Sequence, residues 1–303
     1  MLKQALGFTF AALIATGAGT SFAQDTGTLK KVHDSGKIVM GVRDASAPLS
    51  FTLGGGQYTG YHVELCDRII DAVKAHIKLP GLKVEHALVT SQNRIPLVEN
   101  GTVDIECGST TNNAARQNLV AFALTTYVTE VRMAVKANSN ITSINQLNGR
   151  NVATTTGTTS VQTLRKHELA TGIDFKQVFG KDHSDSFLLL QSGRADAFVM
   201  DDNILAGNIA NAQNPADYKI VGEVLSVEPI SIMLRKNDPA FKKIADDTIR
   251  AMMASGDMAK LYTKWFQSPI PPRNSNLNMP IGATLKNLFQ FPNDHPMEAY
   301  AKK

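Results

Sequence analysis

Arg116 follows a run of hydroxyl side chains at the point where a predicted strand gives way to a helix. Ser109, Thr110 and Thr111 precede it by a few residues. Hydroxyls and exposed backbone N–H groups with a guanidinium above them form a receptor for a carboxylate. The alternative is that Arg116 is a solvated surface residue, which is the commoner role of a lone arginine after a threonine-rich turn.

Residues 156–160, Thr-Gly-Thr-Thr-Ser, repeat this arrangement later in the chain. They lie at a predicted strand-to-helix turn, where Gly157 permits close backbone approach and the helix N-terminus favours an anion. Thr158 or Thr159 could also be the N-cap of that helix, and this role is compatible with ligand binding. The sequence thus places anion-binding chemistry in two separate regions.

No pattern typical of catalysis or metal binding accompanies these residues. The chain has no Gly-x-Ser-x-Gly elbow, no His-Glu-x-x-His, no Cys-x-x-Cys and no nucleotide-binding glycine pattern in a suitable context. Its 7 histidines have no metal-ligand spacing. The net charge of +4 comes from scattered residues rather than a basic stripe, which argues against nucleic acid as a partner. We expect a binding protein without cofactor or metal.

The first 23 residues have the pattern of a secretory signal peptide. Lys3 precedes an apolar run, and small residues ending at Ala23 form the cleavage site. The run is too short for a transmembrane helix, and no later stretch approaches eighteen consecutive apolar residues. We therefore expect an exported protein in the periplasm.

Export changes the interpretation of Cys66 and Cys107, the only cysteines in the chain. In an oxidising compartment an even number of cysteines permits a disulfide. The sequence alone does not show that they are close, and two buried free thiols remain the alternative.

Two units with alternating strands and helices follow the signal peptide. In the first, strands are predicted at residues 37–42, 82–88 and 102–107, with helices at 63–77 and 93–99. In the second, strands at 152–155 and 197–200 flank helices at 158–167 and 184–192. This order predicts an α/β fold with mostly parallel sheets.

Extended segments at residues 130–136 and 230–236 bracket the second unit. They suggest that the chain leaves a first domain, builds a second and returns, with a ligand cleft between the domains and a two-strand hinge. The predicted boundaries are 24–132 and 231–276 for domain 1, 133–230 for domain 2 and 277–303 for a C-terminal tail. Two ordinary strands in one large sheet are the alternative.

The mature chain resembles the extracytoplasmic solute-binding proteins of polar amino acid ABC transporters, family 3. The similarity rests on Gly41-Val42-Arg43, on Gly60-Tyr61 before the first long helix, and on residues 90–97, 100–104, 106–113, 181–187, 200–202 and 269–272. His62 departs from the pattern, because the family usually has an acidic residue there. The resemblance implies a type II periplasmic-binding-protein fold.

The resemblance also implies roles for individual residues. Arg116 and Thr159 would close on the α-carboxylate of an amino acid from opposite domains. Asp201, Ser109 and Thr111 would receive its ammonium group. The full expected ligand set is Arg43, Ser91, Arg94, Ser109, Thr111, Arg116, Thr156, Thr159, His183 and Asp201.

Surplus positive charge indicates an acidic ligand. If the family geometry holds, Arg43, Arg94 and His183 converge on a distal carboxylate, although His183 alone would more often be a structural histidine. A buried guanidinium without a counter-ion costs several kcal/mol, so such a pocket is complete only when the ligand brings two carboxylates. This favours L-glutamate and L-aspartate over amides.

We therefore expect a monomeric binding protein that closes around its ligand and delivers it to an inner-membrane ABC permease. The alternative is an exported enzyme on the same scaffold, similar to cyclohexadienyl dehydratase. Such an enzyme would need a general acid beside the anion receptors, and Glu106 and Asp201 are the nearby candidates.

Overall fold

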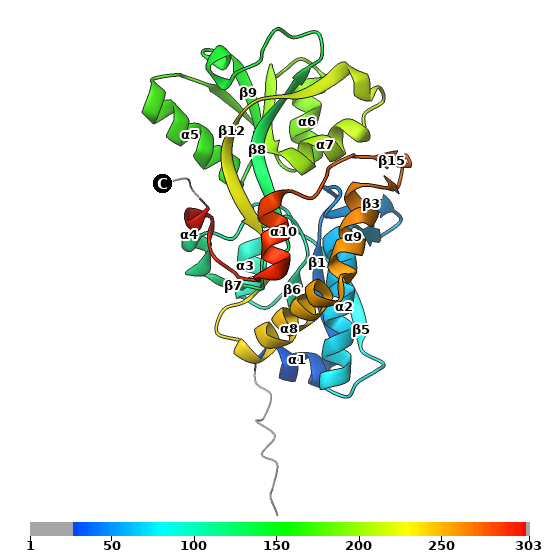
Figure 1. Ribbon diagram of the computed structural model, residues 1–303. Coiled ribbons are helices and arrows are strands. Elements are labelled where there is room, and N and C mark those ends of the chain that lie inside the picture. Colours follow the sequence, from blue (N-terminus) through cyan, green and yellow to red (C-terminus); the bar gives the residue numbers. More distant parts are fainter. Residues whose placement is uncertain (1–26, 301–303) are drawn as a thin grey trace, which may run out of the picture.

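The computed structural model of the protein describes residues 27–300. The predicted signal peptide, residues 1–23, lies outside the described residues. The described chain forms two lobes, which long strands connect (Figure 1). Each lobe is built around one five-stranded sheet, as the two-domain prediction requires.

The first domain begins with a sheet and its helices. Its elements before the crossing are α1 (Thr28–Ser35), β1 (Lys37–Val42), β2 (Ala45–Ser46), β3 (Ser50–Gly54), β4 (Gln57–Thr59), α2 (Tyr61–His76), β5 (Lys83–Leu88), α3 (Arg94–Glu99), β6 (Ile105–Glu106), α4 (Ala114–Gln117) and β7 (Val120–Phe122). Strands β1, β5 and β6 are parallel. The short strands β2, β3 and β4 form a separate antiparallel sheet.

The second domain is built from one continuous stretch. Its elements are β8 (Tyr127–Lys136), η1 (Ile144–Leu147), β9 (Asn151–Thr155), α5 (Thr159–Thr171), β10 (Lys176–Gly180), α6 (His183–Gln191), β11 (Ala197–Asp201), α7 (Asp202–Ala210), η2 (Pro215–Asp217) and β12 (Tyr218–Ile230). The sheet order is β10-β9-β11-β8-β12. β9, β10 and β11 are parallel, and β8 and β12 are antiparallel to their neighbours.

The chain then returns to the first domain. The returning elements are β13 (Met233–Arg235), α8 (Pro239–Ser255), α9 (Asp257–Phe266), β14 (Pro269–Ile270), β15 (Ser275–Asn276), α10 (Ala283–Gln290) and η3 (Met297–Ala299). β13 inserts between β6 and β7 and is antiparallel to both, which makes the first sheet mixed.

The two crossing strands are β8 and β12, which pair antiparallel from Tyr127 opposite Ile230. The predicted second crossing, residues 230–236, was wrong in its placement. The strand that crosses is β12, and the segment after it contains β13 of the first sheet. The domain boundary predicted after residue 132 falls within β8, and the boundaries as such stay a prediction.

Helix α2 illustrates why the periodic segments fold as expected. Its apolar residues Leu65, Ile69, Ile70 and Val73 recur on one face and are buried. This face belongs to the core of the first domain, and α2 packs against α8 and α9. The second domain has two smaller cores, one associated with each face of its sheet. The result is a rigid support for the loops that follow the strands.

The C-terminal segment packs against the first domain (Figure 1). Leu285 and Leu288 of α10 are buried in its core. Further on, Thr125 N–H donates to Asn293 O at 2.9 Å, and Asn112 Nδ2 donates to Asp294 O at 2.9 Å. The described part of the predicted C-terminal tail, residues 277–300, therefore packs on the first domain.

None of the helices between residues 27 and 300 combines the length and apolar character that crossing a bilayer requires.

Cys66 in α2 and Cys107 after β6 form a disulfide. The structure thus decides between the two alternatives for these residues. Both cysteines are buried, and neither lies on a crossing strand. The bond joins a helix to the sheet that the helix covers.

We expect reduction of this disulfide to lower the melting temperature with little effect on ligand affinity. The bond joins residues 41 positions apart, and the chain-entropy model gives about 4 kcal/mol for such a loop. Thermal unfolding with and without reductant, with calorimetry of the same samples, measures both quantities. A large loss of affinity in folded, reduced protein would contradict this prediction.

Candidate functional site

The candidate ligand residues lie at or just after the carboxyl ends of parallel strands in both domains. In open α/β sheets, this edge is where ligands bind. The residues after each strand are Arg43 after β1, Ser91 and Arg94 after β5, Ser109 and Thr111 after β6, Thr156 and Thr159 after β9, and His183 after β10, while Asp201 ends β11. The two sets of strand ends face one another across the domain interface, where several of these side chains meet.

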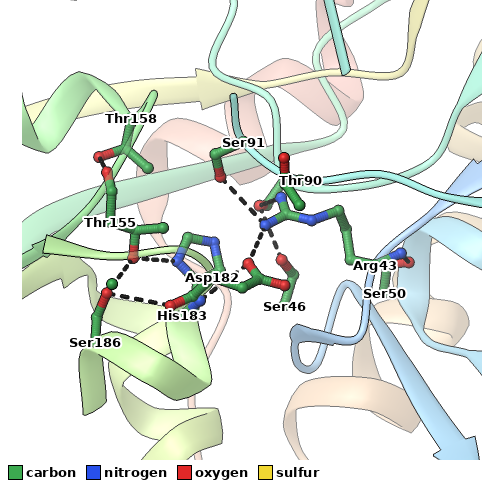
Figure 2. A network of polar contacts seen from close by, with 12 residues as sticks. Arg43, Ser46, Ser50, Thr90, Ser91, Thr155, Thr158, Asp182, His183 and Ser186 are labelled. Carbon is green, nitrogen blue, oxygen red and sulfur yellow. Dashed lines mark hydrogen bonds and ion pairs between the residues drawn. The ribbon is translucent and has the colours of Figure 1, made fainter. Parts of the chain in front are cut away.

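Arg43 is fully buried and reaches across to the second domain. Its Nη1 donates to Ser109 Oγ at 3.3 Å, and its Nη2 donates to Ser91 Oγ at 3.2 Å. Nη2 also forms an ion pair with Asp182 Oδ1, and Figure 2 shows this arginine directed toward Asp182 and His183. Arg43 therefore has a counter-ion within the protein.

Asp182 is the first of two functional candidates that the sequence analysis did not assign. It is the N-cap of α6, where its Oδ1 also accepts the backbone N–H of His183 at 2.9 Å. A helix N-cap is an ordinary role for aspartate, so the sequence alone carried no signal of a contact with the other domain. Burial acts to raise the pKa of this partly buried carboxyl, but the charge of Arg43, the electrostatic interaction with His183 and the hydrogen bonds outweigh it and hold the pKa below its ordinary value.

Arg94 is buried and forms no ion pair with the described residues. Its side chain is at the start of α3, the residue is 2% exposed, and its Nε and Nη1 have no hydrogen-bond partner among residues 27–300. Burial lowers its pKa to about 9, and the charges of Arg116 and Arg43 add to this effect. A buried cation of this kind favours an anionic ligand that accepts hydrogen bonds.

Arg116 is held in α4, whose N-cap Asn113 accepts its backbone N–H at 2.8 Å. Its Nη1 donates to Thr111 O at 2.8 Å, and its Nη2 donates to Gly157 O of the second domain at 3.4 Å. The residue is 9% exposed, and burial lowers the pKa of its guanidinium. The surface-residue alternative for Arg116 therefore does not hold.

Gly157 lies where the backbones of the two domains approach each other closely. Its φ is +81°, and a Cβ built there would lie 2.7 Å from Gln92 Cα of the first domain. The predicted need for glycine in this turn is thus explained by the opposing backbone. The neighbouring Thr156 is half-buried and donates to Gly180 O at 3.3 Å, so its hydroxyl is bonded within its own domain.

Thr111 and Thr159 meet from opposite domains, with their Oγ1 atoms 3.5 Å apart. Both hydroxyls donate to Oε2 of Glu228, at 2.6 Å from Thr111 and 2.7 Å from Thr159. Glu228 lies on the crossing strand β12 and is fully buried. It is the second candidate that the sequence analysis missed, because one acidic residue in a long strand matches no motif.

Asp201 is a buried carboxyl with the acidic Glu228 and Asp202 and the basic Arg94 and Arg116 around it. Burial raises its pKa well above the ordinary value, and the charges of Glu228 and Asp202 act in the same direction. Although it precedes α7, its side chain makes no capping hydrogen bond to that helix. A cation placed beside this carboxyl would lower its pKa again, so the position favours an ammonium group.

His183 is neutral in this environment. Burial and the charges of Arg43 and Arg94 lower its pKa to about 3, although Asp182 opposes the shift. Its Nδ1 lies 3.0 Å from Thr155 Oγ1, and its Nε2 has no partner among residues 27–300 (Figure 2). When Thr155 donates to Nδ1, the ring carries its proton on Nε2, which can then donate to an anion.

Two of the other sequence observations have structural explanations. His62 is buried, with Nδ1 against Gly108 O and Nε2 2.8 Å from Thr126 Oγ1, and burial lowers its pKa to about 4. Glu106 is buried beneath the site and accepts the hydroxyl of Thr110 at 2.7 Å. Within residues 27–300, no group of histidine, cysteine and acidic side chains could hold a metal ion.

The sequence model of the bacterial extracellular solute-binding proteins, family 3, matches residues 38–268. The chain belongs to this family. The matched part spans both domains and both crossing strands, which agrees with the family resemblance seen in the sequence. It ends before the C-terminal segment with α10.

Curated relatives of this family 3 protein include transport proteins for acidic amino acids. The chain is 46% identical to the L-glutamate/L-aspartate-binding protein of Pseudomonas aeruginosa, covering 90% of this chain and 91% of the relative. It is 43% identical to the glutamate/aspartate import solute-binding protein of Escherichia coli K12, covering 93% and 95%.

A solved structure bears on the enzyme alternative. The ancestral amino acid-binding protein AncCDT-1, described as a precursor of cyclohexadienyl dehydratase, aligns with a TM-score of 0.68 at 28% identity. The alignment covers 79% of this chain and 99% of that chain. The fold thus serves amino acid binding in proteins related to that enzyme, and the much closer curated relatives are binding proteins.

Proposed function

We propose that this protein captures L-glutamate and L-aspartate by closing its two domains and delivers them to an inner-membrane ABC permease. The observation that carries the proposal is Arg94, a buried guanidinium with unpartnered Nε and Nη1 atoms. The names of the curated relatives support the same ligand class.

The distal carboxylate of the ligand is assigned to Arg43 and Arg94 of the first domain and to His183. Arg94 offers two buried donors, whereas Arg43 already bonds to Ser91, Ser109 and Asp182. Arg94 is therefore the main distal contact in this proposal, and Arg43 supports it. An amide in place of the carboxylate would leave the charge of Arg94 without compensation.

The amino acid end is assigned to residues of both domains. Arg116 binds the α-carboxylate through the planar fork that its present backbone acceptors occupy, and Thr159 of the second domain lies at the same end of the ligand. The buried carboxyl of Asp201 receives the ammonium group with Ser109 and Thr111. Because the ligand bonds to both domains only when they meet, it stabilises the closed arrangement selectively.

The cellular role follows the family. We propose that the mature protein works in the periplasm as a monomer and docks on a permease in its closed form. The family is described as extracellular, and a relative is named for import.

Titration calorimetry of the acidic amino acids and their amides tests this function. We expect one site with a Kd of about 1 μM or tighter for L-glutamate and L-aspartate, or about −8 kcal/mol. Glutamine and asparagine should bind at least about tenfold more weakly, because a charged hydrogen bond contributes about 1.5–3 kcal/mol. Equal affinity for acids and amides would contradict the proposal.

Recovery of unchanged glutamate after binding, and no turnover of cyclohexadienyl acids, separate this proposal from the enzyme alternative. Turnover that depends on Glu106 or Asp201 would favour the enzyme.

A further inference from the structure

Glu228 occupies the place where the two domains and a crossing strand come together. Its backbone pairs with Thr129 of β8, and its side chain is fully buried. Both carboxylate oxygens are bonded: Oε2 accepts from Thr111 and Thr159, and Oε1 accepts from Ser226 Oγ at 2.7 Å. No other carboxylate in residues 27–300 is bonded to both of these threonines.

Counting hydrogens fixes what the two threonines can offer to a ligand. A carboxylate only accepts hydrogen bonds, whereas a hydroxyl has one hydrogen and two lone pairs. Thr111 and Thr159 each give that hydrogen to Glu228 Oε2. Their hydroxyl oxygens therefore face other partners as acceptors only.

An acceptor-only surface distinguishes between the two groups at the amino acid end. An ammonium group donates hydrogen bonds and matches these oxygens, but a carboxylate has no hydrogen to donate. This conflicts with a hydrogen bond from the Thr159 hydroxyl to the α-carboxylate, which the sequence analysis had expected. The α-carboxylate then depends on Arg116, while the hydroxyls, Asp201 and the charge of Glu228 favour the ammonium.

We infer that Glu228 is a positioning residue that makes the site selective for amino dicarboxylic acids over dicarboxylic acids without an amine. It acts through Thr111 and Thr159, whose lone pairs it directs to the ammonium group. This inference rests on the proposed function and adds the source of its selectivity for the amine.

Replacing Glu228 with Gln tests the inference. Calorimetry compares L-glutamate with glutarate, which has the same two carboxylates and no amine. Glutamine in place of Glu228 keeps one acceptor oxygen, which can still accept from both threonines while the amide nitrogen faces Ser226, but it removes the negative charge beside the ammonium group. We expect L-glutamate to bind about tenfold or more weakly and glutarate to change less than about threefold.

Two further variants provide a control and a second, independent test. Ser226→Ala removes the hydroxyl that donates to Oε1 of the same carboxylate. It should leave the ratio of glutamate affinity to glutarate affinity unchanged. Thr111→Val removes the oriented hydroxyl itself and should lower that ratio as Glu228→Gln does. This variant decides the matter if Glu228→Gln does not fold.

The outcomes separate this inference from the proposed function. Wild-type protein that binds neither acidic amino acid would overturn both. Wild-type binding together with equal losses of both ligands in folded Glu228→Gln or Thr111→Val would overturn only the inference, because it would show a general structural role. An unchanged ratio in both variants would overturn it as well.

Discussion

Replacing Arg94 with Ala should weaken L-glutamate binding by about 100-fold or more, while L-glutamine binding changes far less. The reason is that Arg94 brings a charge and the buried Nε and Nη1 groups, which have no hydrogen-bond partner within the described part of the chain. Each charge-assisted hydrogen bond contributes about 1.5–3 kcal/mol, so two lost bonds give the expected factor. Calorimetry of both ligands with both proteins measures the effect.

A matched variant separates charge from volume. Arg94→Met keeps an unbranched side chain in the same place and should lose glutamate affinity like Arg94→Ala. Its free energy of unfolding without ligand should not fall, because Arg94 forms no ion pair with residues 27–300 that the substitution would remove. Parallel losses for glutamate and glutamine in either variant would place Arg94 at the common amino acid end or in the fold.

Replacing Arg116 with Lys should weaken both acidic amino acids by at least about tenfold, and the amides with them. Lysine keeps the charge but loses the planar fork that now spans Thr111 O in one domain and Gly157 O in the other. The loss should appear for every ligand with an α-carboxylate, unlike the selective loss at Arg94.

Arg132 in β8 provides the control for this substitution. Its Nη2 donates to a backbone oxygen, that of Gly222, at 2.7 Å, but it is not among the candidate ligand residues. Arg132→Lys should therefore keep wild-type affinity. Wild-type affinity in Arg116→Lys would remove Arg116 from the binding site.

Local periodicity was enough to predict helices such as α2 and α6 and the parallel strands β1, β5, β6, β9 and β11. The parallel strand β10 was missed, because its side chains are mostly exposed or half-buried and give a weak apolar signal. The second crossing was misplaced for a related reason. Residues 230–236 are apolar and alternating, but this is also the pattern of β13, which is buried within the first sheet. The actual crossing strand β12 is half exposed over much of its length and gives a weak apolar signal.

Strand ends and motifs point to the same positions at Arg43, Arg94 and Arg116, whose roles in ligand binding stay a prediction. The acidic partners Asp182 and Glu228 were missed because their importance arises only when the two domains meet. Asp182 has an ordinary N-cap role within its own domain, and Glu228 contacts residues far away in sequence. The bond between Cys66 and Cys107 likewise required the packing of α2 against its sheet.

The position of β13 has a consequence for the order in which the protein can fold. This strand separates β6 from β7, although the whole second domain lies between β7 and β13 in the sequence. When the chain emerges with its N-terminal end first, the second sheet, which is built from one continuous stretch, can be completed before the first sheet. The edges of β6 and β7 that pair with β13 stay unpaired until residues 233–235 have emerged. Strands with an unpaired edge are the most prone to pair with another molecule. The domain that begins the chain is therefore the last to be completed.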